Sequence, residues 1–215
     1  MAFLVDILFV ATSRTTLVII PVLAILYASR QFDWKGIVAT VGVCFVLAGA
    51  AWAASPYLRD RVADIFSQTE AYENEHAVTS TGERIVFWTK SVRFIKSAPL
   101  VGHGTGSITA MFRKAAIGET GVRAEVAANP HNQTFAVAIQ LGLLGAAVLW
   151  AMWVSHLVWF RGTGVVAWIG LIVVTQNIVG SLFNSFLFDF TEGWLYVIGV
   201  GVAGGMALKQ EAAKG

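Results

Sequence analysis

The sequence contains little charge, few prolines and a single cysteine. Its 15 basic and 13 acidic side chains are spread over 215 residues, with four prolines and Cys44 as the lone thiol. One cysteine excludes a disulfide within the chain, and since Cys44 lies inside an apolar run we interpret it as a small lipid- or helix-facing residue. So little charge in a chain that is 56% hydrophobic is not the composition of a soluble domain. It predicts transmembrane helices.

The few charges are concentrated in one stretch, residues 55–132. Seventeen of the 28 charged residues fall there, which leaves 11 for the remaining 137 positions. Long apolar runs flank it at residues 36–54, 133–157, 164–183 and 186–208. The pattern predicts an all-α, polytopic helical bundle with three parts: membrane helices over 1–54, a water-facing loop over 55–132, and three membrane helices with a short tail over 133–215.

The opening apolar stretch, residues 2–12, is too short to cross a bilayer at about 1.5 Å per residue. It has no basic head or small-residue cleavage site, and Asp6 interrupts it, so we do not interpret it as a signal peptide. We expect it to be the end of a membrane helix whose first part lies outside this sequence. On this interpretation the chain is the C-terminal part of a larger protein.

Basic residues mark alternate ends of the predicted membrane helices. They are Arg30, Lys35, Arg161, Lys209 and Lys214. Short loops rich in Lys and Arg stay in the cytoplasm, so these ends are predicted to be cytoplasmic and the long loop to face the other side. In a bacterium that side is the periplasm.

Within the loop, Ser80 and Glu83 form a capping box that predicts a helix ending before Pro99. Projected at 100° per residue, this helix has an apolar face made of Ile85, Trp88, Val92 and Ile95. The opposite, wet face is expected to carry Lys90, Arg93 and Lys96. Arg84 falls at the edge of the apolar face, where it either snorkels to water or has a function.

A glycine-rich turn follows at residues 100–106, L-V-G-H-G-T-G, and then a predicted short helix over 107–116. Alternate glycines can expose backbone N–H groups to a phosphate. Because no strand precedes them and no G-K-[ST] follows, we favour a plain tight turn. His103 within it is expected to be a surface residue.

The loop ends with Asn129-Pro130-His131-Asn132, which predicts a helix start with Asn129 as N-cap and Pro130 at the first position. His131 is then expected in the first turn of the next membrane helix. The positive helix terminus there favours a neutral imidazole that can accept a proton and also attracts anions. The alternative is an interfacial histidine without function.

Four polar residues interrupt the last two apolar runs: Gln176, Asn177, Asp189 and Glu192. Polar groups in membrane segments usually face the interior of the bundle. The two acids, however, lie where they would also favour a helix N-terminus.

Taken in order, these pieces resemble a known family. The order is S-R at Arg14, R-x-x-x-W from Arg84, P-L-x-G-x-G from Pro99, and H-N followed after nine residues by G-x-x-G, from His131 to Gly145. It is similar to the O-antigen ligase and O-antigen polymerase family of bacterial inner-membrane proteins. The resemblance covers residues 13–145, and helices compatible with it follow.

The resemblance implies a fold similar to the GT-C class and transfer of a glycan from undecaprenyl diphosphate to an acceptor on the periplasmic side. By position, Arg14 and Arg84 match the arginines that hold the diphosphate, and His131 matches the essential histidine. Lys90, Arg93, Arg123 and His103 are further candidates for binding donor or acceptor. Lipid A-core is the expected acceptor, with a second lipid-linked repeat (polymerase) or a protein Ser or Thr (oligosaccharyltransferase) as alternatives.

The chemistry agrees with this assignment. Guanidinium groups bind diphosphate oxygens bidentately, and a neutral imidazole can accept a hydroxyl proton. The sequence contains no H-E-x-x-H and no D-x-D, so we expect no metal and no cofactor, and we expect membrane lipids but no nucleic acid as partners. A transporter of lipid-linked sugars and an inactive fragment remain the alternatives from other classes, although we find no inverted repeat of the kind that would favour a transporter.

Overall fold

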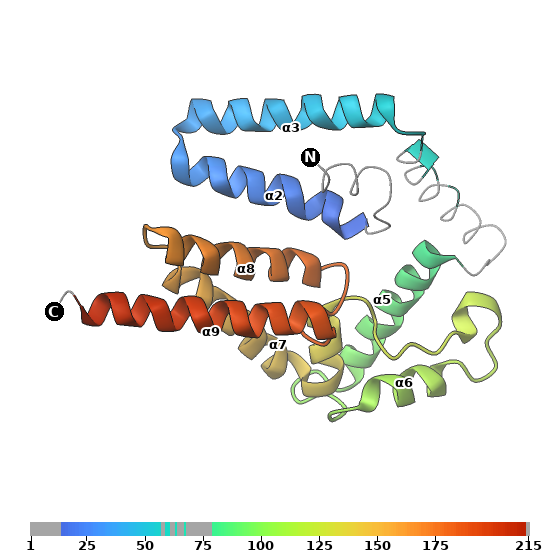
Figure 1. Ribbon diagram of the computed structural model, residues 1–215. Coiled ribbons are helices and arrows are strands. Elements are labelled where there is room, and N and C mark those ends of the chain that lie inside the picture. The colour runs from blue at the N-terminus through green and yellow to red at the C-terminus, as the bar shows by residue number, and fades with distance from the viewer. Residues whose placement is uncertain (1–13, 57–58, 61–62, 64–66, 68–78, 214–215) are drawn as a thin grey trace. The chain divides into compact units, whose positions relative to one another are not determined.

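The computed structural model describes residues 14–56, 59–60, 63, 67 and 79–213, and these residues form seven α-helices and one 3-10 helix (Figure 1). The predicted all-helical class is confirmed. The chain divides into two compact units, residues 1–81 and 82–215. The apolar stretch at 2–12 lies outside the described residues.

The first unit contains two packed helices, α2 (Arg14–Gln31) and α3 (Trp34–Ala54). Two residues join them, and the second of these, Asp33, caps α3 by accepting a hydrogen bond from Gly36 N at 3.0 Å. Helix α3 is long and apolar enough to cross a membrane, and none of its residues is buried within the chain. Phe45, for example, is 74% exposed. An apolar helix with so much exposed surface suits lipid or further membrane helices rather than water.

The second unit contains the three later apolar helices, α7 (Gln133–Trp159), α8 (Val165–Ser181) and α9 (Phe190–Ala212). Helix α8 contacts both of the others (Figure 1). Of the three, α7 and α9 are long enough to cross a membrane, whereas α8 is a shorter apolar helix. The predicted runs are confirmed as helices, although the last helix begins at Phe190 and not at Phe186.

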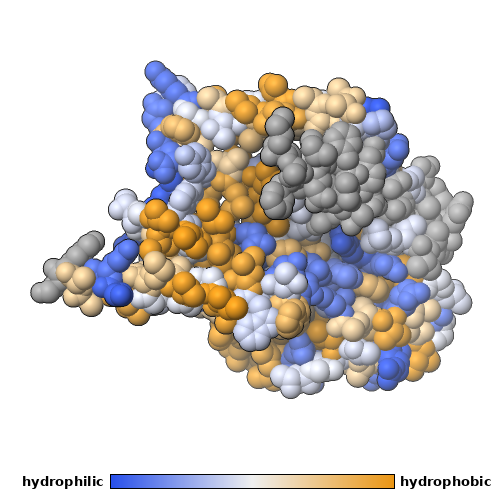
Figure 2. Space-filling model, in the orientation of Figure 1, coloured by the Kyte–Doolittle hydropathy of each residue, from blue (hydrophilic) through white to orange (hydrophobic). Residues whose placement is uncertain are grey.

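Apolar side chains predominate on the outer surface of α8 and α9 (Figure 2). The exposed apolar residues of α9 include Val197, Ile198 and Val202, and α7 carries Leu144 and Val148; each of the five is more than half exposed. A patch of this extent indicates a surface that meets lipid or other membrane helices. The geometry therefore agrees with the composition in indicating a helical membrane protein.

Along the chain, α3 is followed by α5 (Ser80–Ser97), α6 (Ser107–Ala115) and the 3-10 helix η1 (Gly121–Ala124), which precede α7. Both α-helices occupy the predicted residues. Phe112 of α6 is fully buried, and its ring meets Phe87 and Phe94 of α5 edge to face at centroid distances of 5.4 and 5.2 Å. These three rings form the contact that holds α6 on α5.

The predicted orientation of α5 is wrong. Its buried face carries Val86, Phe87, Lys90, Ser91 and Phe94, whereas Ile85 and Val92 are 37% and 39% exposed. Phe87 and Phe94 determine which face of α5 is buried, because burying both rings against Phe112 removes more apolar surface from water than burying the smaller aliphatic residues. Lys90 lies between them, so its hydrocarbon stem is buried as well.

Candidate functional site

Helix α7 is interrupted at Gly142, whose φ of 67° and ψ of −166° are not helical. The glycine-rich turn at residues 100–106 packs against α7 at this interruption. The N–H groups of His103 and Gly104 donate to the carbonyls of Ile139 and Gln140 at 2.9 Å, and those of Leu143 and Leu144 donate to the carbonyls of Pro99 and Leu100 at 2.7 and 3.3 Å. Groups that the break in the helix would leave unpaired are thereby satisfied.

This packing decides between the two interpretations of the turn. The N–H of Gly106 also has a partner, the side-chain oxygen Oε1 of Gln140 at 2.7 Å. With the N–H groups of His103, Gly104 and Gly106 engaged, the turn serves to complete α7, and the plain-turn interpretation is supported over phosphate binding. His103 is held too, since its Nε2 donates to the carbonyl of Phe94 at 2.9 Å.

His131 does not lie in the first turn of α7, as predicted, but before it. The side chain of Asn129 accepts a hydrogen bond from His131 N at 2.8 Å and so closes a turn around Pro130. Asn132 is the N-cap instead and accepts from Phe135 N at 3.0 Å. His131 takes a left-handed φ of 55°, a conformation that histidine tolerates better than most residues.

The imidazole of His131 faces the turn between α8 and α9. Its Nδ1 lies 3.1 Å from Oδ1 of Asn184, and Nδ2 of Asn184 donates to Oδ2 of Asp189 at 2.9 Å. The ring of Phe87 stacks against the imidazole with a centroid distance of 6.3 Å and an interplanar angle of 17°. We call this arrangement the His131–Asn184–Asp189 chain.

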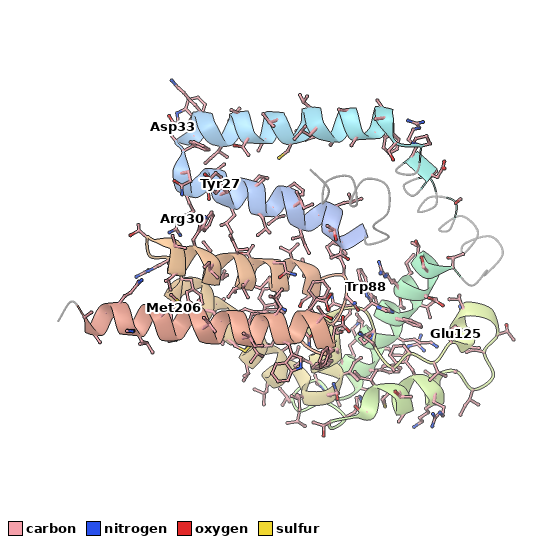
Figure 3. All side chains as sticks on the ribbon, viewed as in Figure 1. Tyr27, Arg30, Asp33, Trp88, Glu125 and Met206 are labelled. Atoms are coloured by element: carbon pink, nitrogen blue, oxygen red, sulfur yellow. The ribbon has the colours of Figure 1, made fainter. Side chains whose placement is uncertain are left out.

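Further hydrogen bonds attach the segment around His131 to its neighbours. Trp88 Nε1 donates to the carbonyl of Pro130 at 3.0 Å, which ties the segment to α5 (Trp88 is labelled in Figure 3). Ser185 Oγ donates to Oδ1 of Asn129 at 2.7 Å, and Asn132 Nδ2 donates to the carbonyl of Leu182 at 3.0 Å. His131 is therefore positioned by two elements that are distant in sequence, α5 and the turn between α8 and α9.

The α8–α9 turn and the start of α7 thus lie at one end of the helices, and Arg161 and Lys209 belong to the segments at the other end. Burial raises the pKa of the Asp189 carboxyl, the charge of Glu192 raises it further, and His131 lowers it. The last effect acts through space and reflects how near His131 lies to Asp189.

Arg84 is partly buried on α5, three residues before Phe87 and four before Trp88. Residues at these spacings share a helix face, so Arg84 lies on the side of α5 that contacts the segment around His131. Arg14 is the first residue of α2 in the other unit, and its side chain lies outside the described part of the chain. The structure accordingly brings Arg84 and His131 into one unit, while the role of Arg14 stays a prediction.

The expectation that Lys90 lies on the wet face is wrong, since it is only 6% exposed. Its Nζ donates to the carbonyl of Arg123 and lies 5.9 Å from the centre of the Phe112 ring. Burial lowers the pKa of Lys90, Glu119 raises it and Arg93 lowers it. Lys90 therefore holds η1 on α5, whereas the side chains of Arg93 and Arg123 are exposed.

Sequence reasoning missed Asn129 and Asn184 as members of the site. Asn184 falls in the short turn between two apolar runs, where a polar pair Asn-Ser is unremarkable by itself. The available signal was Asp189 five residues later, a carboxylate at the edge of a membrane segment. Nothing local connects Asn184 or Asp189 to His131, which is 53 positions away from Asn184.

Residues 1–150 of the chain match the sequence profile of a protein family described as O-antigen ligase. The match includes Arg14, Arg84, His131 and Gly142, and it ends before α8. A comparison with individually curated proteins finds no match. Because the matched region covers more than half of the chain and the described residues form apolar helices of membrane-spanning length, this protein belongs to the O-antigen ligase family of membrane enzymes.

Proposed function

We propose that this protein is a glycosyltransferase that moves a glycan from undecaprenyl diphosphate to a sugar hydroxyl of lipid A-core. The observation that carries the proposal is the placement of His131 at the end of a membrane-spanning helix, with Nδ1 bound to Asn184. In a neutral imidazole whose Nδ1 carries the proton, Nε2 has the lone pair and is the nitrogen able to act as a base.

In the proposed reaction, Nε2 of His131 accepts the proton of the acceptor hydroxyl. The hydroxyl oxygen forms a bond to the anomeric carbon of the glycan as the bond from that carbon to the diphosphate oxygen breaks. The lipid diphosphate leaves with the electron pair and an additional negative charge. A single displacement of this kind inverts the configuration at the anomeric carbon.

Arg84 and Arg14 are the proposed ligands of the diphosphate. Guanidinium groups match phosphate oxygens in geometry and stabilise the charge that develops on the leaving group without a metal. The exposed side chains of Arg93 and Arg123 are secondary candidates for anionic groups of either substrate. Lys90 and His103 take part through the structure they hold, since both have backbone carbonyls as partners.

The reaction is proposed to take place on the periplasmic side of the bacterial inner membrane. The basic residues at the opposite helix ends support this orientation, because such ends stay in the cytoplasm. The α8–α9 turn, which carries Asn184 and Asp189, contains no Lys or Arg. His131 would then meet the lipid-linked donor at the outer leaflet.

The test is glycan transfer in proteoliposomes that contain the full chain and undecaprenyl-diphosphate-linked glycan. We choose His131→Asn, because asparagine tolerates the left-handed φ at this position, whereas alanine would add backbone strain. Its amide can still donate to Asn184 but cannot act as a base. Transfer is expected to fall by about 10²-fold or more, while binding of the donor is unchanged.

Arg84→Gln is the second variant and is expected to weaken donor binding as well as transfer. Glu125→Gln, at an exposed carboxylate that follows η1, serves as a control with no expected effect (Glu125 is labelled in Figure 3). Parallel reactions with lipid A-core, a second lipid-linked repeat or a Ser- and Thr-containing peptide distinguish ligase, polymerase and oligosaccharyltransferase. Full transfer by His131→Asn would overturn the proposal.

A further inference from the structure

We infer that Asn184 is a positioning residue that carries the influence of the Asp189 carboxylate to His131 and fixes the imidazole as the Nδ1–H tautomer. The inference rests on the proposed function, in which Nε2 of His131 accepts the proton. It assigns a role to two residues of the α8–α9 turn, which lies beyond the region matched by the family description. Neither residue needs to touch a substrate for this role.

The first argument starts from Asp189. An ionised carboxylate only accepts hydrogen bonds, so the group of Asn184 that lies 2.9 Å from Asp189 Oδ2 must be its NH₂. The carbonyl oxygen of the same amide then points to His131. Since that oxygen can only accept, Nδ1 of His131 must carry the proton.

A second, independent argument starts from Asn129 and reaches the same orientation. Its side-chain oxygen accepts the backbone N–H of His131, which can only donate. The NH₂ group of Asn129 therefore faces Asn184, and it lies 3.4 Å from the same atom, Oδ1. Two donors thus converge on Oδ1 of Asn184, and turning over its amide would break the bonds to Asn129, His131 and Asp189 together.

A purely structural role for the Asn184 side chain is the competing explanation. The turn, however, has its own backbone hydrogen bonds, from Asn184 N to the carbonyl of Gly180 at 3.0 Å and from Phe188 N to that of Ser185 at 2.9 Å. These remain when the side chain is changed. Loss of the amide should consequently alter the state of His131 more than the fold of the turn.

Among the described residues, the charged groups near the His131–Asn184–Asp189 chain come from two helices. Asp189 and Glu192 lie at the start of α9, and Arg84 lies on the side of α5 that contacts the segment around His131. Helix α5 meets the imidazole itself through the uncharged ring of Phe87. A carboxylate that influences His131 through an amide stabilises the imidazolium less than one in direct contact. The arrangement thus orients the imidazole without placing a carboxylate in direct contact with it.

The first experiment measures the tautomer directly, without any substrate. The full chain is labelled with ¹⁵N-histidine in lipid nanodiscs, and the signal of His131 is identified among the four histidines as the one that His131→Asn removes. At a pH at which the ring is neutral, the wild type is expected to show protonated Nδ1 and unprotonated Nε2. Asn184→Ala is expected to give a mixture of both tautomers.

The second experiment exchanges the two polar groups. Asn184→Asp combined with Asp189→Asn keeps one carboxylate and one amide but places the carboxylate against His131. We expect Asn184→Ala to reduce kcat by about 10²-fold with an unchanged KM for the donor, and the exchanged pair to recover a large part of that loss. The acid limb of its pH profile should move to higher pH, because a carboxylate in direct contact favours imidazolium.

The outcomes separate this inference from the function on which it rests. If His131→Asn retains full transfer, the proposed function fails. If His131→Asn is inactive while Asn184→Ala keeps wild-type kcat and the Nδ1–H tautomer, only the role of Asn184 is overturned. An exchanged pair that is as inactive as Asn184→Ala, with an unmoved pH profile, would also overturn it.

Discussion

Gly102 and Gly142 meet so closely that neither position has room for a side chain. A Cβ on Gly102 would lie 2.6 Å from the backbone nitrogen of Gly142, and a Cβ on Gly142 would lie 2.2 Å from the carbonyl oxygen of Leu100. Both glycines also have positive φ. The glycine-rich turn and the interrupted helix α7 are therefore one structural unit, which explains why the sequence needs glycine in both places.

Alanine at either position should accordingly be strongly destabilising. We expect Gly102→Ala and Gly142→Ala to cost more than the roughly 1–2 kcal/mol of left-handed strain alone, because the obstructing atoms are backbone. Gly104 also has a positive φ, but a Cβ there would meet no other atom within 4 Å. Gly104→Ala should therefore cost only the free energy of the backbone strain. Gly205→Ala, in α9 with nothing nearby, should be neutral or slightly stabilising. Thermal unfolding in detergent measures the series, and equal effects at Gly104 and Gly142 would contradict it.

Trp88→Phe should loosen the segment around His131 while largely preserving the fold. The change removes the hydrogen bond from Nε1 to the carbonyl of Pro130 and keeps an aromatic ring against Phe135. The expected cost is about 1 kcal/mol in the free energy of unfolding, with a larger relative loss of transfer. Trp194→Phe, at an exposed indole of α9, is the matched control. Equal loss of transfer in both variants would count against the role of Trp88.

Asp189→Asn should remove a pH-dependent penalty on stability. The folded carboxyl has a raised pKa, so between its usual pKa and this higher value the folded state binds more protons than the unfolded state. Stability contributed by this group therefore decreases as the pH rises through that window, and the penalty persists above it. The stability of Asp189→Asn relative to wild type should increase from pH 3.5 to neutrality. Unfolding temperatures measured across this range test the sign, and a relative decrease would show it to be wrong.

Lys90 should contribute through its ammonium as well as its stem. Lys90→Met keeps the buried hydrocarbon volume but removes the hydrogen bond to the carbonyl of Arg123, at an expected cost of about 1–3 kcal/mol. Because burial lowers the pKa of Lys90, the folded state binds fewer protons than the unfolded state between the lowered and the usual pKa. The wild type should thus gain stability as the pH rises through that window, and Lys90→Met should lack this gain.

Lys96→Met, at an exposed position on the same helix, is the control for Lys90. It should change the unfolding temperature little at any pH. Hydrogen exchange at residues 121–124 offers a second measurement, since η1 should lose protection in Lys90→Met alone. Unchanged protection there would mean that Lys90 does not hold η1.

The candidate site was predictable in part. The order of the motifs pointed to His131 and Arg84, and the family match includes both. The surroundings of His131 were not predictable in the same way. A strong local signal, Asn129 before Pro130, suggested the helix start three residues too early, because Asn129 uses its oxygen to close a turn and Asn132 caps the helix.

The sequence by itself determined the membrane helices, since the length of an apolar run and its flanking polar residues are properties of consecutive positions. It also determined the extents of α5 and α6 through caps, Pro99 and glycine. Only the tertiary structure decided that Lys90 is buried, that the turn at Gly102 completes α7 at Gly142, and that Asn184 and Asp189 face His131. Each of these depends on which surfaces of distant segments meet, and the energy that selects those contacts, as with Phe112 between Phe87 and Phe94, belongs to no single stretch of the chain.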